Sequence, residues 1–169
     1  MKLSDLRRGD EEWQVAVLNG PALTRQLAAI DDFEGLLAEW GRQLGVRVEH
    51  FGSNHEGRIL EFIHASTAAT QGYVVNPGGV TTTGESLRHA LRDSRRPHVE
   101  VHLDKATHDF ARSIFAPSVT GIFTGLGEFS YLGALTSIVL ALDDEDFLGP
   151  HGHSDINRSD GAPRSLFGG

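Results

Sequence analysis

The sequence contains no cysteine, a single methionine and only two tyrosines, Tyr73 and Tyr131. The absence of cysteine excludes disulfides, thiolate metal sites, iron–sulfur clusters and cysteine nucleophiles. No apolar run approaches the roughly 20 residues that span a bilayer, and the first ten residues lack the apolar core of a secretion signal. Basic residues number 15 against 23 acidic ones, for a net charge of −8. We therefore expect a cytoplasmic protein with no membrane partner and no nucleic-acid partner, because no positive field faces a phosphate backbone.

The chain is long enough for one domain with its own core, at 169 residues of which 39% are hydrophobic. Residues 1–12 are polar and predict an amino-terminal arm. Residues 13–148 carry the alternating apolar patterns of the domain. Residues 149–169, rich in glycine, serine, aspartate and histidine, predict a flexible carboxy-terminal tail.

Short apolar runs alternate with helical patterns through the domain. The runs predict strands at 13–18, 46–51, 72–75, 98–103 and 119–124. Between them, apolar residues at helical spacing predict helices, one of which Gly41 or Gly45 ends and another of which a capping box of Ser53 and Glu56 begins. Five such alternations predict an α/β fold, a flavodoxin-like three-layer sandwich with a five-stranded parallel sheet in the order 2-1-3-4-5.

Polar residues follow several of the predicted strands. Asn19, the stretch 53–55, the turn 76–79, His102 and Asp104 all come where a strand ends. Ligands of open α/β sheets bind at the carboxyl ends of the strands, so these residues predict a small-molecule site. The alternative is conformational, because asparagine and glycine also occupy such turns without touching a ligand.

The fourth predicted strand carries the most specific pattern. Its alternation places His98, Glu100 and His102 on one face and valines and a leucine on the other. A carboxylate beside a histidine is suited to general acid–base chemistry, with Glu100 orienting His102 and stabilising its charged form. A structural core pair, or an edge strand with one wet face, is the alternative.

No phosphate-binding or dinucleotide-binding motif is present. His55 and His64 have poor metal-ligand spacing. His151 and His153 could bind metal but are more typical of a solvated loop, so we predict no metal and no cofactor.

Taken together, these stretches resemble the type II 3-dehydroquinate dehydratases. The resemblance covers about residues 13–143 and rests on Val15 to Pro21, Ser53 to Gly57, Asn76 to Gly79, Val99 to Leu103 and Thr120 to Gly127, in the order of that family. It implies a flavodoxin-like fold and an assembly of identical chains, a trimer or a dodecamer. In the family, a lid tyrosine beside a lid arginine removes a proton next to a ketone, and a histidine protonates the leaving hydroxyl.

The resemblance also implies roles for individual residues. His102, Glu100 and Asn19 are expected to be catalytic. The expected substrate-binding residues are Asn76, Gly78, Gly79, Thr82, His89, Leu103, Asp104, Arg112 and Arg25.

Departures from the family pattern shape the functional prediction. The segment 22–30, which replaces the lid, is about half as long and has no tyrosine, and neither Tyr73 nor Tyr131 is placed to replace it. Asp104 puts a carboxylate where a substrate carboxylate is expected. The sequence therefore predicts a diverged lyase that uses His102 and Glu100 on a different small substrate. Two alternatives stay open: an authentic 3-dehydroquinate dehydratase with a replaced lid, and a non-catalytic ligand-binding or assembly protein.

Overall fold

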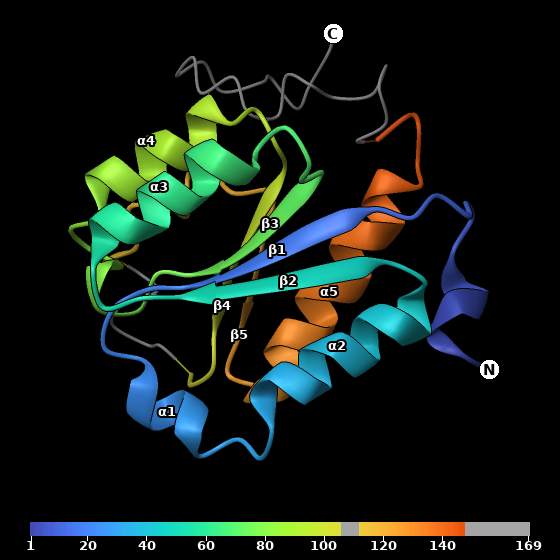
Figure 1. Ribbon diagram of the computed structural model, residues 1–169, viewed down its shortest axis with the longest axis horizontal. Coiled ribbons are helices and arrows are strands. Elements are labelled where there is room, and N and C mark those ends of the chain that lie inside the picture. Colours follow the sequence, from blue (N-terminus) through green and yellow to red (C-terminus); the bar gives the residue numbers. More distant parts are fainter. Residues whose placement is uncertain (106–111, 148–169) are drawn as a thin grey trace, which may run out of the picture.

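The computed structural model describes residues 1–105 and 112–147 (Figure 1). The predicted tail, residues 149–169, lies outside the described residues. Among the described helices, none is long and apolar enough to cross a membrane. The elements in chain order are η1 (Leu3–Leu6), β1 (Gln14–Asn19), α1 (Thr24–Ala28), α2 (Phe33–Leu44), β2 (Arg47–Gly52), α3 (Glu56–Ser66), β3 (Gly72–Asn76), η2 (Gly78–Val80), α4 (Glu85–Asp93), β4 (His98–His102), β5 (Gly121–Thr124) and α5 (Glu128–Leu142).

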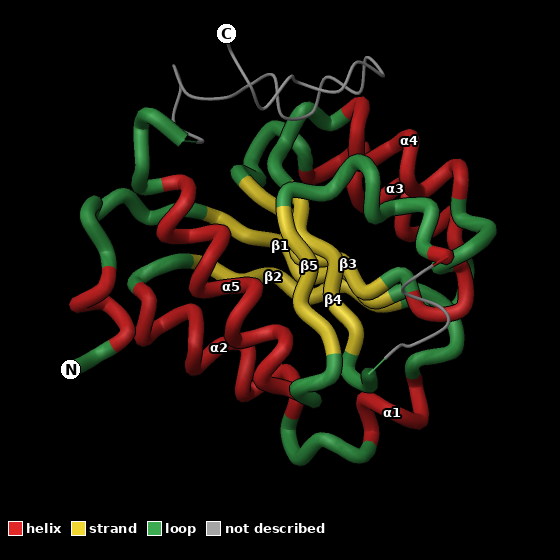
Figure 2. Tube along the Cα trace, turned by 180° about the vertical axis from the view of Figure 1, so that it is seen from behind, coloured by secondary structure: helices red, strands yellow, loops and turns green. Residues whose placement is uncertain are grey.

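The sheet has five parallel strands in the order β2-β1-β3-β4-β5, which confirms the predicted topology. Helices α2 and α5 cover one face and helices α3 and α4 cover the other (Figures 1 and 2). Because both faces are covered, the three central strands are buried along their length. The carboxyl ends of the strands meet at the edge where the short helix α1 lies (Figure 1).

Local sequence signals explain several helix ends. The Asp32 side chain accepts a hydrogen bond from the Gly35 amide and caps α2, and Gly45 ends that helix with a φ of 69°. The predicted capping box at the start of α3 is wrong. Ser53 accepts from the His55 amide, whereas Glu56 reaches the amide of Leu87 and caps the first turn of α4. Glu56 thus accepts from the amide of Leu87 in another helix instead of capping its own helix.

The lid segment contains the helix α1, which the sequence pattern did not predict. The turns around it are packed against those that follow β3. The Gly20 amide donates to the carbonyl of Asn76 at 2.8 Å, and the Gly79 amide donates to the carbonyl of Pro21 at 2.7 Å. A side chain at Gly20 would collide with the carbonyl of Pro77, so glycine is required there. This close approach holds the ends of β1 and β3 together.

The amino-terminal arm is tied to its own chain at the opposite edge of the sheet. Arg7 donates to both oxygens of Asp143, at 2.8 and 2.7 Å, and Trp13 Nε1 donates to the same carboxylate at 2.8 Å. Both charged side chains are almost fully buried. The hydrogen bond to Asp143 raises the pKa of Arg7. Burial alone would raise the pKa of Asp143, but the hydrogen bonds from Arg7 and Trp13 outweigh it and hold that pKa below its usual value.

Candidate active site

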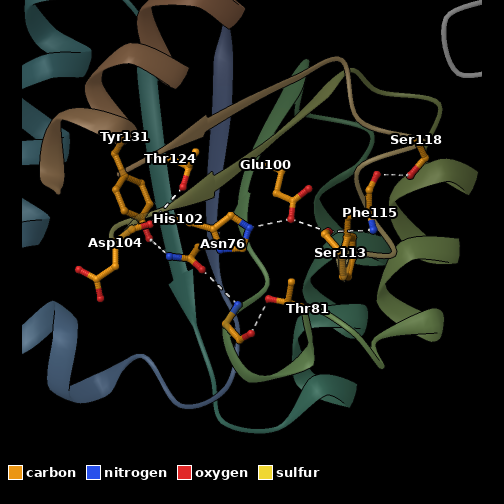
Figure 3. Close-up of polar contacts among 11 residues, drawn as sticks. Asn76, Thr81, Glu100, His102, Asp104, Ser113, Phe115, Ser118, Thr124 and Tyr131 are labelled. Carbon is orange, nitrogen blue, oxygen red and sulfur yellow. Dashed lines mark hydrogen bonds and ion pairs between the residues drawn. The ribbon is translucent and has the colours of Figure 1, made fainter. Parts of the chain in front are cut away.

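The predicted pair of Glu100 and His102 is formed and buried. β4 lies between β3 and β5, so it is not an edge strand and its polar face is covered. His102 Nε2 lies 2.7 Å from Glu100 Oε1, and the Ser113 hydroxyl donates to the same oxygen at 2.6 Å (Figure 3). The other carboxylate oxygen of Glu100 is buried and has no hydrogen-bond partner within the described residues. A carboxylate left half satisfied in the core is costly, which favours a functional role over a structural one.

The geometry assigns the two ring nitrogens of His102 different tasks. Nε2 faces the ionised oxygen of Glu100 and therefore carries the proton. This leaves Nδ1 as the nitrogen that takes or gives a proton. Glu100 stabilises the imidazolium that forms when Nδ1 is protonated, because the two charges are opposite and in contact. The pair is built for general acid chemistry.

His98 lies on the same face of β4 but does not share this task. Its ring is fully buried, and burial lowers its pKa. Nδ1 lies 3.0 Å from the carbonyl of Arg96, which fixes the ring near the start of the strand. His98 therefore stays neutral, and it lies at the start of β4, four residues before His102 at the strand end where a ligand would bind.

A second polar group forms on the other face of the sheet. The Tyr131 hydroxyl, from α5, donates to Asn19 Oδ1 and accepts from Asn76 Nδ2 at 3.0 Å. All three side chains are buried. Figure 3 shows the Tyr131 and His102 groups at the same edge, with Asn76 between them in the view. The two asparagines expected at the site are therefore brought together by a residue that the sequence did not single out.

Tyr131 is poorly suited to be a base. Burial raises its pKa, and the hydrogen bond from Asn76 offsets only part of that increase. The phenol therefore stays protonated and acts as a hydrogen-bonding bridge. Tyr73 lies on the other face, where its hydroxyl contacts Ser66 and Thr67.

The remaining predicted binding residues divide into two sets. The first set lies at the site: the Gly78 amide donates to Asn76 Oδ1 at 3.1 Å, Gly79 packs its turn against Pro21, and Leu103 and Asp104 continue β4. Leu103 is buried in the core. The carboxylate of Asp104 is exposed, and Gln26 of α1 donates to it at 3.3 Å.

The second set has no hydrogen bond or ion pair to the site residues within the described part of the chain. Arg25, Thr82 and Arg112 expose their side chains to solvent. His89 lies on the exposed side of α4, where it contacts Arg92 at 3.0 Å. Thr81, rather than Thr82, is the buried threonine of this turn, and it donates to the carbonyl of Gly78 at 2.6 Å. Within the described residues, no group of three or more histidines and acidic residues is arranged to hold a metal ion.

Sequence reasoning missed Ser113 and Gln26, and it considered Tyr131 only as a replacement for the lid tyrosine, not as a partner of the asparagines. Tyr131 lies in the apolar stripe of α5, where an aromatic residue indicates a core position. Ser113 lies outside the predicted strands and helices. The one available signal for Tyr131 was its place at the start of the helix that follows β5, close to the carboxyl edge.

Comparison with known proteins places these features in a family. Residues 13–139 match the family model described as dehydroquinase class II. A 3-dehydroquinate dehydratase of Halothermothrix orenii is 38% identical over 138 residues, covering 75% of this chain and 93% of the relative. One of Thermotoga maritima is 37% identical over 144 residues, covering 78% of this chain and 98% of the relative.

Solved structures agree with these matches. The type II dehydroquinase of Propionibacterium acnes superposes with a TM-score of 0.68 at 32% identity, covering 75% of this chain and 97% of the other. A 3-dehydroquinate dehydratase-like protein of Bifidobacterium longum gives a TM-score of 0.59 at 29% identity, covering 75% and 95%. With its strand order, its buried histidine–glutamate pair and these matches, the chain belongs to the class II dehydroquinase family.

Proposed function

We propose that this protein is a 3-dehydroquinate dehydratase, which removes water from 3-dehydroquinate to give 3-dehydroshikimate. The observation that carries the proposal is the contact of His102 with the buried Glu100, closed by Ser113. The named activity of the relatives supports the substrate. No relative supports the different substrate that the departures from the family pattern predicted.

The acid half of the reaction follows from the geometry of the pair. Elimination releases the hydroxyl group of the substrate as water, so that oxygen must receive a proton. His102 Nδ1 supplies it, while Glu100 holds Nε2 and stabilises the charged ring. Asn19 and Asn76, fixed by Tyr131, position the substrate and its water at the same edge.

The base half needs a group that removes the proton beside the ketone. Tyr131 stays protonated, which leaves it unsuited to this step. Asp104 follows His102 by two residues and contacts the lid helix α1 through Gln26. Its carboxylate is exposed at the carboxyl edge, and we assign it the role of base.

The direct test is to follow the conjugated enone of 3-dehydroshikimate by ultraviolet absorbance. We expect turnover from the wild-type protein and a loss of roughly 10²- to 10⁴-fold in His102→Ala, the usual contribution of a general acid. His64→Ala is the matched control, because His64 is exposed on α3, and it should keep wild-type turnover. If the wild-type protein is folded but does not turn over 3-dehydroquinate, a different substrate is favoured. Equal turnover in wild type and His102→Ala would exclude the acid role of His102.

A further inference from the structure

A second histidine, His50, contacts the asparagine–tyrosine group, which consists of Asn19, Asn76 and Tyr131. It lies on β2, and its Nε2 is 2.8 Å from Asn19 Nδ2. Its Nδ1 is 3.1 Å from Glu34 Oε1, at the start of α2. The ring packs edge-on against Phe33 with 5.4 Å between centroids. The carboxyl edge therefore carries two glutamate–histidine pairs, one on each face of the sheet.

The direction of the hydrogen bonds in this group is set at one end by the backbone. The Gly78 amide can only donate, so the atom of Asn76 that it meets is the oxygen Oδ1. Asn76 then turns Nδ2 toward Tyr131 and donates to it. The Tyr131 oxygen accepts that bond, so its own proton is donated onward to Asn19 Oδ1.

The same logic fixes the protonation of His50. Because Asn19 spends its oxygen on Tyr131, it presents Nδ2 to the imidazole and donates. His50 Nε2 must then accept, so the ring is neutral and carries its proton on Nδ1, where Glu34 accepts it. A proton on Nε2 would set two donors against each other. Asn19 would have to turn over to relieve the conflict.

The charged surroundings of His50 are simple. Glu34 from α2 is the charged group in contact with it, and that carboxylate is 80% exposed whereas the His50 side chain is 17% exposed. Tyr131 of α5 is the next titratable group, one asparagine away. On β2 itself the neighbouring acidic residue, Glu49, is exposed and accepts from Gln14.

We propose that His50 is a positioning residue: as a neutral acceptor it holds the Asn19 amide in the one orientation that keeps the Tyr131 proton on Asn19. This proposal rests on the proposed function, in which Asn19 helps to position the substrate and its water. Protonation of His50 reverses the amide and turns the Tyr131 proton elsewhere. The hydrogen bonds of this group therefore require the neutral ring, with Nε2 as the acceptor and Nδ1 as the donor.

Two variants separate this role from packing. Gln in His50→Gln keeps an oxygen that can accept from Asn19, so we expect turnover within about threefold of wild type. Phe in His50→Phe keeps a ring against Phe33 but removes the acceptor, so we expect kcat to fall by about tenfold with KM little changed, the loss of one hydrogen bond. Wild-type kcat in His50→Phe, or a kcat in His50→Gln as low as that of His50→Phe, would overturn the proposal.

A measurement independent of turnover keeps this test separate from that of the proposed function. Nitrogen-15 NMR of the histidine rings distinguishes the two neutral tautomers, and the His50 signals are assigned by their absence in His50→Gln. We expect a protonated Nδ1 and an unprotonated Nε2 at neutral pH, the reverse of the tautomer that free histidine prefers. A proton on Nε2 contradicts the proposal even if the enzyme is active. If 3-dehydroquinate is not turned over, the observed tautomer by itself tests whether His50 Nε2 accepts from Asn19.

Discussion

Two buried carboxylates, Asp143 and Glu100, lie at opposite edges of the sheet and differ in how many of their oxygens accept hydrogen bonds. At the amino edge, both oxygens of Asp143 accept hydrogen bonds, from Arg7 and Trp13. At the carboxyl edge, Glu100 has one oxygen with two donors and another with none within the described part of the chain. A saturated carboxylate stabilises the fold, whereas one that is held incompletely retains capacity for chemistry. The comparison predicts that disrupting the first lowers stability without changing activity, and that replacing the second lowers activity without lowering stability.

The largest effect is expected at a third carboxylate, Asp104, which belongs to the active edge but is exposed. If it is the base, Asp104→Asn lowers turnover of 3-dehydroquinate by roughly 10²- to 10⁴-fold. The free energy of unfolding should not change, because the side chain is solvated. Steady-state turnover and urea unfolding measure the two quantities, and unchanged turnover would remove Asp104 from the mechanism.

At Glu100, replacement by glutamine keeps the shape and an acceptor oxygen but removes the charge that supports the His102 imidazolium. We expect turnover to fall by roughly 10²-fold. The free energy of unfolding should stay the same or rise, because a desolvated charge has been removed from the core. A clear loss of stability without loss of turnover would show that Glu100, like Asp143, has a structural role, and would contradict the comparison.

At the amino edge, Arg7→Met leaves Asp143 buried without its cation. Breaking a buried pair in this way costs about 3 kcal/mol of unfolding free energy. Arg8→Met is the matched control, since Arg8 is 81% exposed and 3.7 Å from Asp144, and should change stability by less than about 0.5 kcal/mol. Urea denaturation measures both, and turnover per folded molecule should equal that of wild type in each.

The smallest effect is the pH dependence of the stability that the Arg7–Asp143 pair contributes. The pKa of Asp143 is lowered in the folded protein. Its contribution to stability is therefore complete above the usual aspartate pKa of about 3.9 and is lost as the pH falls through the lower, folded value. The stability difference between wild type and Arg7→Met should narrow below about pH 4. A difference that stays constant from pH 7 to pH 3 would show that Arg7 acts by packing.

Assembly as a trimer or dodecamer stays a prediction from the family resemblance. Leu126, in the turn between β5 and α5, and Phe129, in the first turn of α5, are more than half exposed, and β5 is an edge strand of the sheet. Analytical ultracentrifugation would measure the assembly state.

The sequence alone determined the fold class, the strand order and the acid pair. Period-two alternation places Glu100 and His102 on one face of one strand, and alternating strands and helices leave few topologies. The sequence also showed that the segment 22–30, which replaces the lid, is short and has no tyrosine. The inference from them, that the substrate has changed, is not supported by the relatives.

Only the tertiary structure decided what completes the site. Tyr131 meets Asn19 across 112 positions of sequence, and Arg7 meets Asp143 across 136. His50 meets Asn19 from the neighbouring strand, and Ser113 meets Glu100 from a segment with no regular pattern. No local spacing predicts such contacts, because each depends on how whole elements pack. The strand pattern placed the reacting histidine, and the packing of α2 and α5 on the sheet brought Glu34 to His50 and Tyr131 to Asn19 on the other face.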